Sequence, residues 1–192
     1  MAGWIKKKLL RLIGIYDYDR VGEERILKAI RLYHSGNRIN RLRAWRLYNK
    51  NLGRYQINIR PDIEVGKDFH LVHAAPLRVG FGVSFGDNCK LYPFCHVMSS
   101  IKPEDWDNNI GTFKKATFGN DCILGAGCAV IGNLTIGDDV TIGAHAIVTK
   151  DVPSHSTVVG TNKIMPKRED QIPEKYKQNN TNAGVTDEGQ NQ

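Results

Sequence analysis

Large apolar residues recur at every sixth position through the central part of the chain. Between residues 116 and 152 they are Phe118, Leu124, Val130, Ile136, Ile142 and Val148. A second row, two positions earlier, consists mostly of small residues: Ala116, Cys122, Cys128, Leu134, Val140, Ala146 and Val152. An amphipathic helix needs apolar spacings of three and four, whereas a six-residue unit ending in Gly, Asn or Asp suits a short strand and a sharp turn. The spacing therefore predicts a parallel β-helix, whose units bury their apolar side by stacking.

Three segments of the chain resemble a known family: HAAPLRVG, ILGAGCAVIGNLTIGDDVTIGAHAIVTKDVP and VVGTNKI. They are similar to the hexapeptide-repeat acyltransferases, and within them to serine O-acetyltransferases and to the O-acetyltransferases of bacterial surface polysaccharides. The resemblance covers residues 59–168 and implies a left-handed β-helix, although parallel crossovers are otherwise nearly always right-handed. The expected fold is mainly β: a left-handed parallel β-helix of about four coils with an N-terminal α-helical region.

Three regions are expected along the chain. Residues 1–57 form a basic α-helical region, residues 58–168 the acyltransferase domain with a loop at 99–115, and residues 169–192 a polar tail that is disordered at its end. Apolar residues at helical spacing predict helices over residues 21–34 and 38–50, with Gly36 as a stop signal between them. The apolar stripe of the second helix, Ile39, Leu42, Trp45 and Tyr48, is typical of core or subunit contact.

The net charge of +7 is concentrated at the N-terminus, where the first 60 residues hold 15 Lys and Arg against 4 Asp and Glu. The opening segment GWIKKKLLRLIGIY mixes apolar and basic residues as an interfacial helix does. Its two interpretations are packing on its own trimer and contact with an anionic membrane or polymer. The absence of a recognised nucleic-acid-binding motif argues against nucleic acid. No apolar run is long enough to cross a bilayer and no secretory signal is evident, so we expect a cytoplasmic protein, with peripheral contact at the inner face of the membrane as an open alternative.

The six-residue pattern is displaced by two positions between Leu71 and Val79, and His73 lies in this displacement. The segment from Val72 to Pro76 aligns with the D-H-A-T-G segment that holds the active-site histidine of serine acetyltransferases. Moving an acetyl group from a thioester to a hydroxyl needs a base for the hydroxyl proton, and a histidine side chain suits that task. We therefore predict His73 to be the catalytic base. No metal is expected, since the four cysteines belong to the row of small core residues.

The pattern breaks again between Val97 and Phe118, where a polar loop is expected. In the family this loop contributes to acceptor recognition, so Trp106 and Asp105 are candidates for stacking on a sugar ring and binding its hydroxyls. His96 and Arg78 are further candidates for the acceptor site.

Two departures from the serine acetyltransferase pattern affect the acceptor. Val72 stands where a carboxylate is expected, and Lys114–Thr117 replaces the segment that holds a second histidine. An acceptor with an ammonium group, such as serine, loses favourable charge partners there. The sequence therefore favours a sugar hydroxyl as acceptor.

The resemblance implies a donor site for acetyl-CoA in a groove between subunits of a homotrimer. The matching turn positions are Gly125 with Ala126 and Gly143 with Ala144, since Gly/Ala turns permit close approach of a ligand. Lys163, Lys167 and Arg168 follow as candidates for contact with the CoA phosphates. Pairing of trimers through the N-terminal helices is left open.

Three functions are compatible with these residues, and a fourth is disfavoured. The first is an acetyl-CoA-dependent O-acetyltransferase acting on a sugar of a surface polysaccharide or its precursor. Serine O-acetylation, as in cysteine biosynthesis, is the enzymatic alternative. A zinc hydrolyase of the carbonic-anhydrase type needs three ligand histidines, and His70, His73 and His96 lack the spacing of that type. A trimeric β-helix scaffold without enzymatic activity is the remaining alternative.

Overall fold

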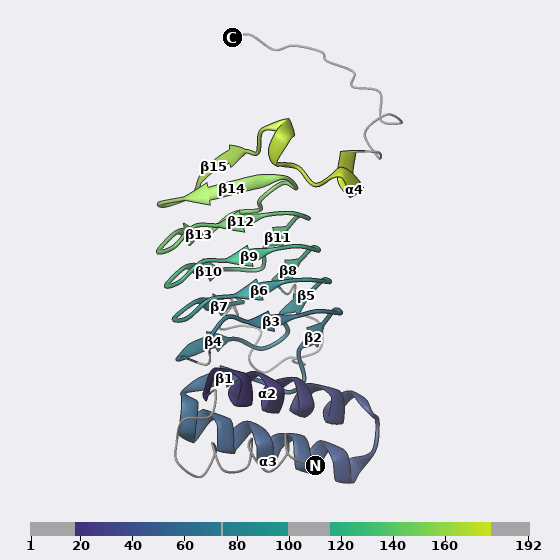
Figure 1. Cartoon of the computed structure of the whole chain (residues 1–192). Coiled ribbons are helices and arrows are strands. Elements are labelled where there is room, and N and C mark those ends of the chain that lie inside the picture. The colour runs from purple at the N-terminus through teal and green to yellow at the C-terminus, as the bar shows by residue number, and fades with distance from the viewer. Residues whose placement is uncertain (1–17, 74, 100–115, 178–192) are drawn as a thin grey trace, which may run out of the picture.

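The structure is a computed structural model that describes residues 18–73, 75–99 and 116–177. Two helices, α2 (Tyr18–His34) and α3 (Arg38–Tyr55), lie side by side below a stack of short strands (Figure 1). Gly36 has a φ of +76°, which ends α2 as predicted. Asn37 caps α3 by accepting a hydrogen bond from the Ile39 amide at 2.9 Å. The second helix continues five residues beyond its predicted end.

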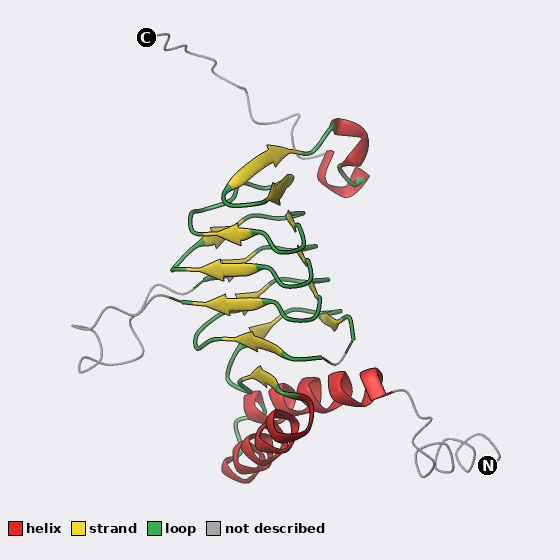
Figure 2. Cartoon of the chain, turned by 90° about the vertical axis from the view of Figure 1, so that its left-hand side faces the viewer, coloured by secondary structure: helices red, strands yellow, loops and turns green. Residues whose placement is uncertain are grey.

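The strands form three sheets, one for each side of a prism, and all strands except β15 pair in parallel (Figure 2). Face A contains β1 (Ile57–Ile59), β4 (Leu77–Val79), β7 (His96–Met98), β10 (Ala129–Ile131) and β13 (Ile147–Val148). Face B contains β2 (Glu64–Val65), β5 (Ser84–Phe85), β8 (Thr117–Phe118) and β11 (Thr135–Ile136). Face C contains β3 (His70–Leu71), β6 (Lys90–Leu91), β9 (Ile123–Leu124), β12 (Thr141–Ile142), β14 (Ser156–Val159) and β15 (Lys163–Pro166). The chain thus winds through four complete coils and part of a fifth, which confirms the predicted β-helix.

The large apolar row forms three columns inside the prism. Strand register stacks Val79, Val97, Val130 and Val148 on face A, Phe85, Phe118 and Ile136 on face B, and Leu71, Leu91, Leu124 and Ile142 on face C. The four cysteines are buried between these columns, as expected for core residues. Val152 departs from the prediction: it pairs with Ile136 and so extends the face B column, because it follows Val148 by four positions instead of six.

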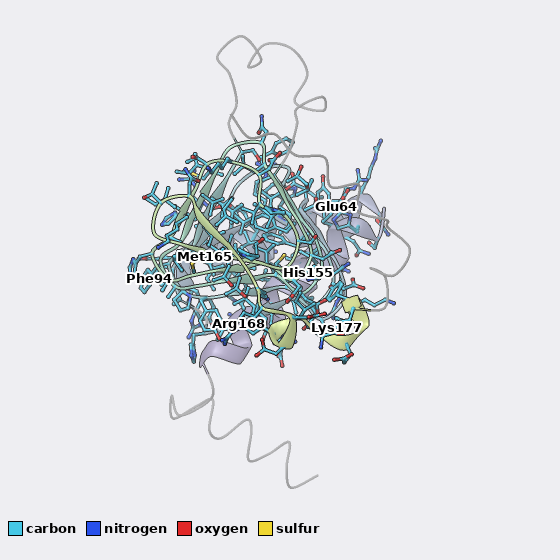
Figure 3. All side chains as sticks on the ribbon, turned by 90° about the horizontal axis from the view of Figure 1, so that it is seen from above. Glu64, Phe94, His155, Met165, Arg168 and Lys177 are labelled. Carbon is cyan, nitrogen blue, oxygen red and sulfur yellow. The ribbon has the colours of Figure 1, made fainter. Side chains whose placement is uncertain are left out.

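Turns between faces stack into corners. We call the turns from face C to face A (residues 72–76, 92–95, 125–128, 143–146 and 160–162) the C–A corner, and those from face B to face C (66–69, 86–89, 119–122, 137–140 and 153–155) the B–C corner. Seen along the prism axis, Phe94 of the C–A corner and His155 of the B–C corner lie well apart (Figure 3). Residues on one corner therefore share a surface that residues on the other do not reach.

The helices are attached to the first coil by polar contacts. Nε2 of His34 lies 2.9 Å from the Ile63 carbonyl oxygen, and the Tyr48 hydroxyl donates to Oδ1 of Asn58 at 2.8 Å. Ile26 and Ile30 join the core of the prism. Within the described residues, no helix is long and apolar enough to span a membrane.

At the other end the chain reverses. β15 runs antiparallel to β14, and η2 (Glu169–Gln171) and α4 (Glu174–Lys177) follow it (Figure 1). The sequence assigned residues 169–177 to a polar tail, but they are ordered, because Lys175 and Tyr176 bind the Asp121 carboxylate of the B–C corner. We call residues 163–177 the C-terminal strap.

Candidate active site

His73 lies at the start of the C–A corner. Eight positions separate Leu71 from Val79, against six between Leu91 and Val97 one coil later, so the first turn of this corner holds two extra residues. His73 has a φ of +71°, which is uncommon for a residue with a side chain, and its side chain is exposed. The Val72 amide donates to the Leu91 carbonyl at 2.8 Å, which fixes the turn on the coil above. The predicted displacement thus puts His73 on an edge of the prism.

The predicted donor turns lie on the same corner. Backbone hydrogen bonds link one turn to the next: Phe94 to Pro76 at 2.7 Å, Gly127 to Pro93 at 2.9 Å and His145 to Ala126 at 2.9 Å. Neighbouring coils of such a stack are about 4.8 Å apart. The Gly125–Ala126 turn is therefore about 10 Å from His73 along the corner, and the Gly143–Ala144 turn is one coil further.

Stacking of the coils requires a glycine at position 125 and leaves little room for a side chain at position 143. A Cβ added at Gly125 would lie 2.7 Å from the Ala144 nitrogen and 2.8 Å from the Ile142 oxygen. At Gly143 the nearest atom, the Val158 oxygen, would be 3.1 Å away. Together with the small side chains of Ala126 and Ala144, these glycines make a narrow ledge of nearly bare backbone. Such a ledge fits an extended ligand that needs close approach to the backbone.

Sequence reasoning missed an aromatic group between His73 and this ledge. Phe94 is 55% exposed and Tyr92 is 36% exposed, and both belong to the intervening turn. Phe94 has a φ of +60° and takes the turn position that Gly127 and His145 occupy one and two coils later. A bulky aromatic residue is unusual in the left-handed region. The signal in the sequence was Phe94 at a repeat position where Gly, Asn or Asp is common.

The three basic residues near the C-terminus are not brought together. β15 crosses face C, so Lys163 lies beside Val159 near the C–A corner, whereas Lys167 and Arg168 lie towards the B–C corner. The ammonium of Lys167 is 2.6 Å from Oδ1 of Asp139. Lys163 is thus the basic residue of this group that shares an edge with the donor turns.

Arg78 and His96 are neighbours on the outer side of face A. They pair in register on β4 and β7, and both side chains are exposed. His70 faces outward from face C, where Nδ1 lies 3.0 Å from Oε1 of Glu23. The predicted acceptor residues Asp105 and Trp106 lie outside the described residues. Within the described ranges, no group of three or more His, Cys, Asp or Glu side chains is arranged to hold a metal ion.

The repeat matches a family model. Residues 115–150 match the family described as bacterial transferase hexapeptide (six repeats). This segment is similar to the hexapeptide repeats of bacterial transferases. The chain's match to the fold of solved serine acetyltransferases assigns the left hand to the β-helix.

The chain is similar to several serine acetyltransferases. The chain is 33% identical over 108 residues to a serine acetyltransferase of Helicobacter pylori, an alignment that covers 55% of the chain and 57% of the relative. The solved serine acetyltransferase of Neisseria gonorrhoeae has a TM-score of 0.63 and 26% identity, over 74% of this chain and 52% of the other. The same enzyme in complex with serine has a TM-score of 0.60 and 25% identity, over 75% and 54%. The chain thus spans about half the length of these relatives.

Proposed function

We propose that this protein is an O-acetyltransferase that moves an acetyl group from acetyl-CoA to a hydroxyl, with His73 as the general base. The observation that carries this proposal is the shared corner of His73 and the Gly125–Ala126 and Gly143–Ala144 turns. The exposed imidazole and the bare backbone ledge lie on one edge, about two coils apart. A base and a binding surface for acetyl-CoA can therefore act on the donor and the acceptor together.

The reaction needs one base and a place for the donor. A ring nitrogen of His73 takes the proton of the acceptor hydroxyl while the oxygen attacks the thioester carbonyl. The carbon–sulfur bond breaks, the acetyl group leaves on the acceptor oxygen, and the proton finally passes to the CoA sulfur. A positioned general base contributes roughly 10²- to 10⁴-fold to such a step.

The donor is proposed to lie along the C–A corner. The Gly125–Ala126 and Gly143–Ala144 turns allow close approach of the pantetheine arm. Lys163, exposed at the far end of the same edge, meets the phosphates. Tyr92 and Phe94 lie between His73 and the ledge and cover the apolar part of the donor. This path uses Lys163 and leaves Lys167 and Arg168 without a part in donor binding.

The first candidate acceptor is serine. The relatives and the solved structures just described are named serine acetyltransferases, and one of them is in complex with serine. They support serine better than the sugar that we expected from the sequence.

A sugar hydroxyl is the second candidate, because Val72 stands in place of a carboxylate before His73. Arg78 and His96, exposed side by side on face A, would then bind hydroxyl or carboxylate groups of the sugar.

Thiol release from acetyl-CoA tests the proposal and separates the two acceptors. The wild-type protein is offered serine, a panel of monosaccharides, extracted surface polysaccharide, or no acceptor. Release that depends on serine supports the first candidate, and release that depends on saccharide supports the second. No release with any acceptor, together with no binding of CoA, contradicts the proposal and favours a scaffold.

A homotrimer is part of the proposal, because an edge of one prism gains a second wall only from a neighbouring subunit. Sedimentation equilibrium measures the mass of the particle in solution. A mass of three chains supports a shared site, and an active monomer contradicts it.

A further inference from the structure

Helix α3 is unusually basic. It contains Arg38, Arg41, Arg43, Arg46, Lys50 and Arg54, and no Asp or Glu. Two of these cations lie over aromatic rings, with Arg41 5.4 Å from the centre of the Tyr33 ring and Arg54 5.9 Å from that of Tyr55. Among the described residues, none pairs by a salt bridge with Arg43, Arg46 or Lys50. A helix with this composition presents a concentrated positive field to its surroundings.

The unpaired cations share one face with two exposed apolar side chains. Ala44, Asn51 and Tyr55 are buried and mark the inner side of α3. At about 100° per residue, the opposite side is formed by Ile39, Leu42, Arg43, Arg46 and Lys50. We call these five residues the outer face of α3.

Ile39 and Leu42 are the most exposed large apolar residues described. Ile39 is 58% exposed and Leu42 is 72% exposed. Both belong to the first turns of α3, next to the three cations. The sequence predicted that they would contact the core or another subunit, but only the inner residues of α3 pack on the chain itself.

We propose that the outer face of α3 docks on an anionic lipid bilayer. The cations approach the lipid head groups, and Ile39 and Leu42 enter the boundary between head groups and acyl chains, as interfacial amphipathic helices do. The position of α3 allows this, because it lies at the end of the prism opposite the C-terminal strap (Figure 1). The helix can therefore lie flat on a surface while the prism stands away from it.

Charge argues against a second copy of the chain as the occupant. An isologous contact sets the same patch of both subunits face to face. Arg43, Arg46 and Lys50 would then meet their own copies without an acidic partner on the helix. Like charges brought together in this way oppose association.

The apolar side chains argue against an anionic polymer. Nucleic acid or an acidic polysaccharide would satisfy the cations but leave Ile39 and Leu42 in water. A bilayer offers both negative charge and a hydrocarbon layer, so it accounts for all five residues of the outer face.

This inference goes beyond the proposed function and does not depend on it, since lipid binding is measured without turnover. It has one consequence for the site. His73 belongs to the first turn of the C–A corner, the turn nearest to the helices. A docked protein would hold its base at the membrane side of the prism, which suits an acceptor carried at or near the lipid surface.

Vesicle flotation of the full chain tests the inference. The vesicles consist of phosphatidylcholine alone or of phosphatidylcholine mixed with phosphatidylglycerol. We expect binding to the mixed vesicles that weakens as salt is added. The triple variant Arg43→Glu, Arg46→Glu, Lys50→Glu should bind at least roughly 100-fold more weakly. Each lost cation contributes roughly fivefold near an anionic surface, and the added carboxylates are repelled by it.

A matched control changes the same net charge elsewhere. The exposed residues Lys67, Lys150 and Arg168 lie on the prism and the strap. Their triple change to Glu should leave lipid binding within about twofold of the wild type. Circular dichroism checks that both triple variants are folded. Equal loss in the two variants would overturn the inference, because net charge alone would then explain binding.

A second variant tests the apolar part. Ile39→Ser with Leu42→Ser keeps every charge and should weaken vesicle binding by about tenfold. Unchanged vesicle binding in this variant, or wild-type binding to an acidic polysaccharide that matches binding to vesicles, would overturn the assignment to lipid. Wild-type binding to mixed vesicles that survives all outer-face changes would assign the contact to another part of the chain and overturn the role of α3.

Discussion

The ammonium of Lys167 lies 2.6 Å from Oδ1 of Asp139, and both side chains are largely buried. Nδ1 of His155 approaches the other carboxylate oxygen at 3.1 Å. This ion pair joins the C-terminal strap to the B–C corner. Lys167 is therefore part of the structure that closes the prism, and Lys163 is the candidate for contact with the donor.

The two lysines should respond differently to substitution. Lys167→Met is expected to lower the free energy of unfolding by about 3 kcal/mol, because it leaves the Asp139 carboxylate buried without its cation. Lys163→Met should leave the unfolding free energy nearly unchanged and raise the KM for acetyl-CoA. Urea unfolding and initial rates measure the two effects. A higher KM with unchanged stability in Lys167→Met would contradict this division of roles.

The contact between the strap and Asp121 should depend on pH. Burial by itself raises the pKa of Asp121, but hydrogen bonds from Lys175, Tyr176 and Asn88 outweigh it and hold the pKa below its ordinary value. A carboxylate whose pKa is lowered in the folded protein stabilises the fold at pH values above the pKa of aspartate in the unfolded chain, which is about 4. That contribution to stability is lost as the pH falls through the lower pKa that Asp121 has in the folded protein.

Asp121→Asn removes this dependence. Unfolding by urea at a series of pH values should show a smaller loss of stability on acidification in the variant than in the wild type. Proteolysis within residues 163–177 should be faster in the variant at neutral pH. Identical acid dependence in the two proteins would show that Asp121 does not hold the strap.

Two glycines form a matched pair for testing the stacking of the coils. Gly125→Ala should destabilise the protein by about 2 kcal/mol, because its Cβ meets backbone atoms of the next coil that cannot move aside. Gly53→Ala, in α3 with no atom within 4 Å of the added carbon, should stabilise it by up to about 1 kcal/mol. Thermal unfolding measures both. Equal effects of the same sign would contradict the stacking argument.

The cysteines should be unreactive in the folded protein. Burial raises the pKa of the Cys128 thiol to about 12 and that of Cys95 above its ordinary value. Since the thiolate is the reactive form, a thiol reagent should titrate neither Cys95 nor Cys128 before urea is added. The hydrogen bond with Cys122 lowers the pKa of Cys89, so burial alone keeps the reagent from that thiol. Rapid modification of one cysteine under native conditions would mean that the prism opens locally.

The solenoid could be predicted because its signal is repeated. A single six-residue unit does not specify one structure. Because large apolar residues recur every six positions from Phe118 to Val148, a stack of coils is the structure that buries all of them. The same regularity made the exception at His73 visible. The four cysteines were assigned to the core for the same reason.

Features without a repeat were harder to predict. The reversal of β15, which separates Lys163 from Lys167, depends on contacts with Asp139 and Asp121, and these lie far away in sequence. α3 continues past Lys50 because burial of the Tyr55 ring outweighs the poor helix propensity of Gly53. The exposure of Phe94 was hard to predict, because it follows from a left-handed backbone conformation that phenylalanine disfavours.

The most direct test of the proposed mechanism is thiol release from acetyl-CoA by His73→Asn. Asn tolerates the left-handed backbone conformation of His73, so the turn should be retained. His70→Asn, three residues earlier on face C, is the matched control. We predict that His73→Asn loses acceptor-dependent release by roughly 10²-fold or more, with unchanged thermal stability, while His70→Asn retains it. Full activity of a folded His73→Asn would contradict the assignment of His73 as the base.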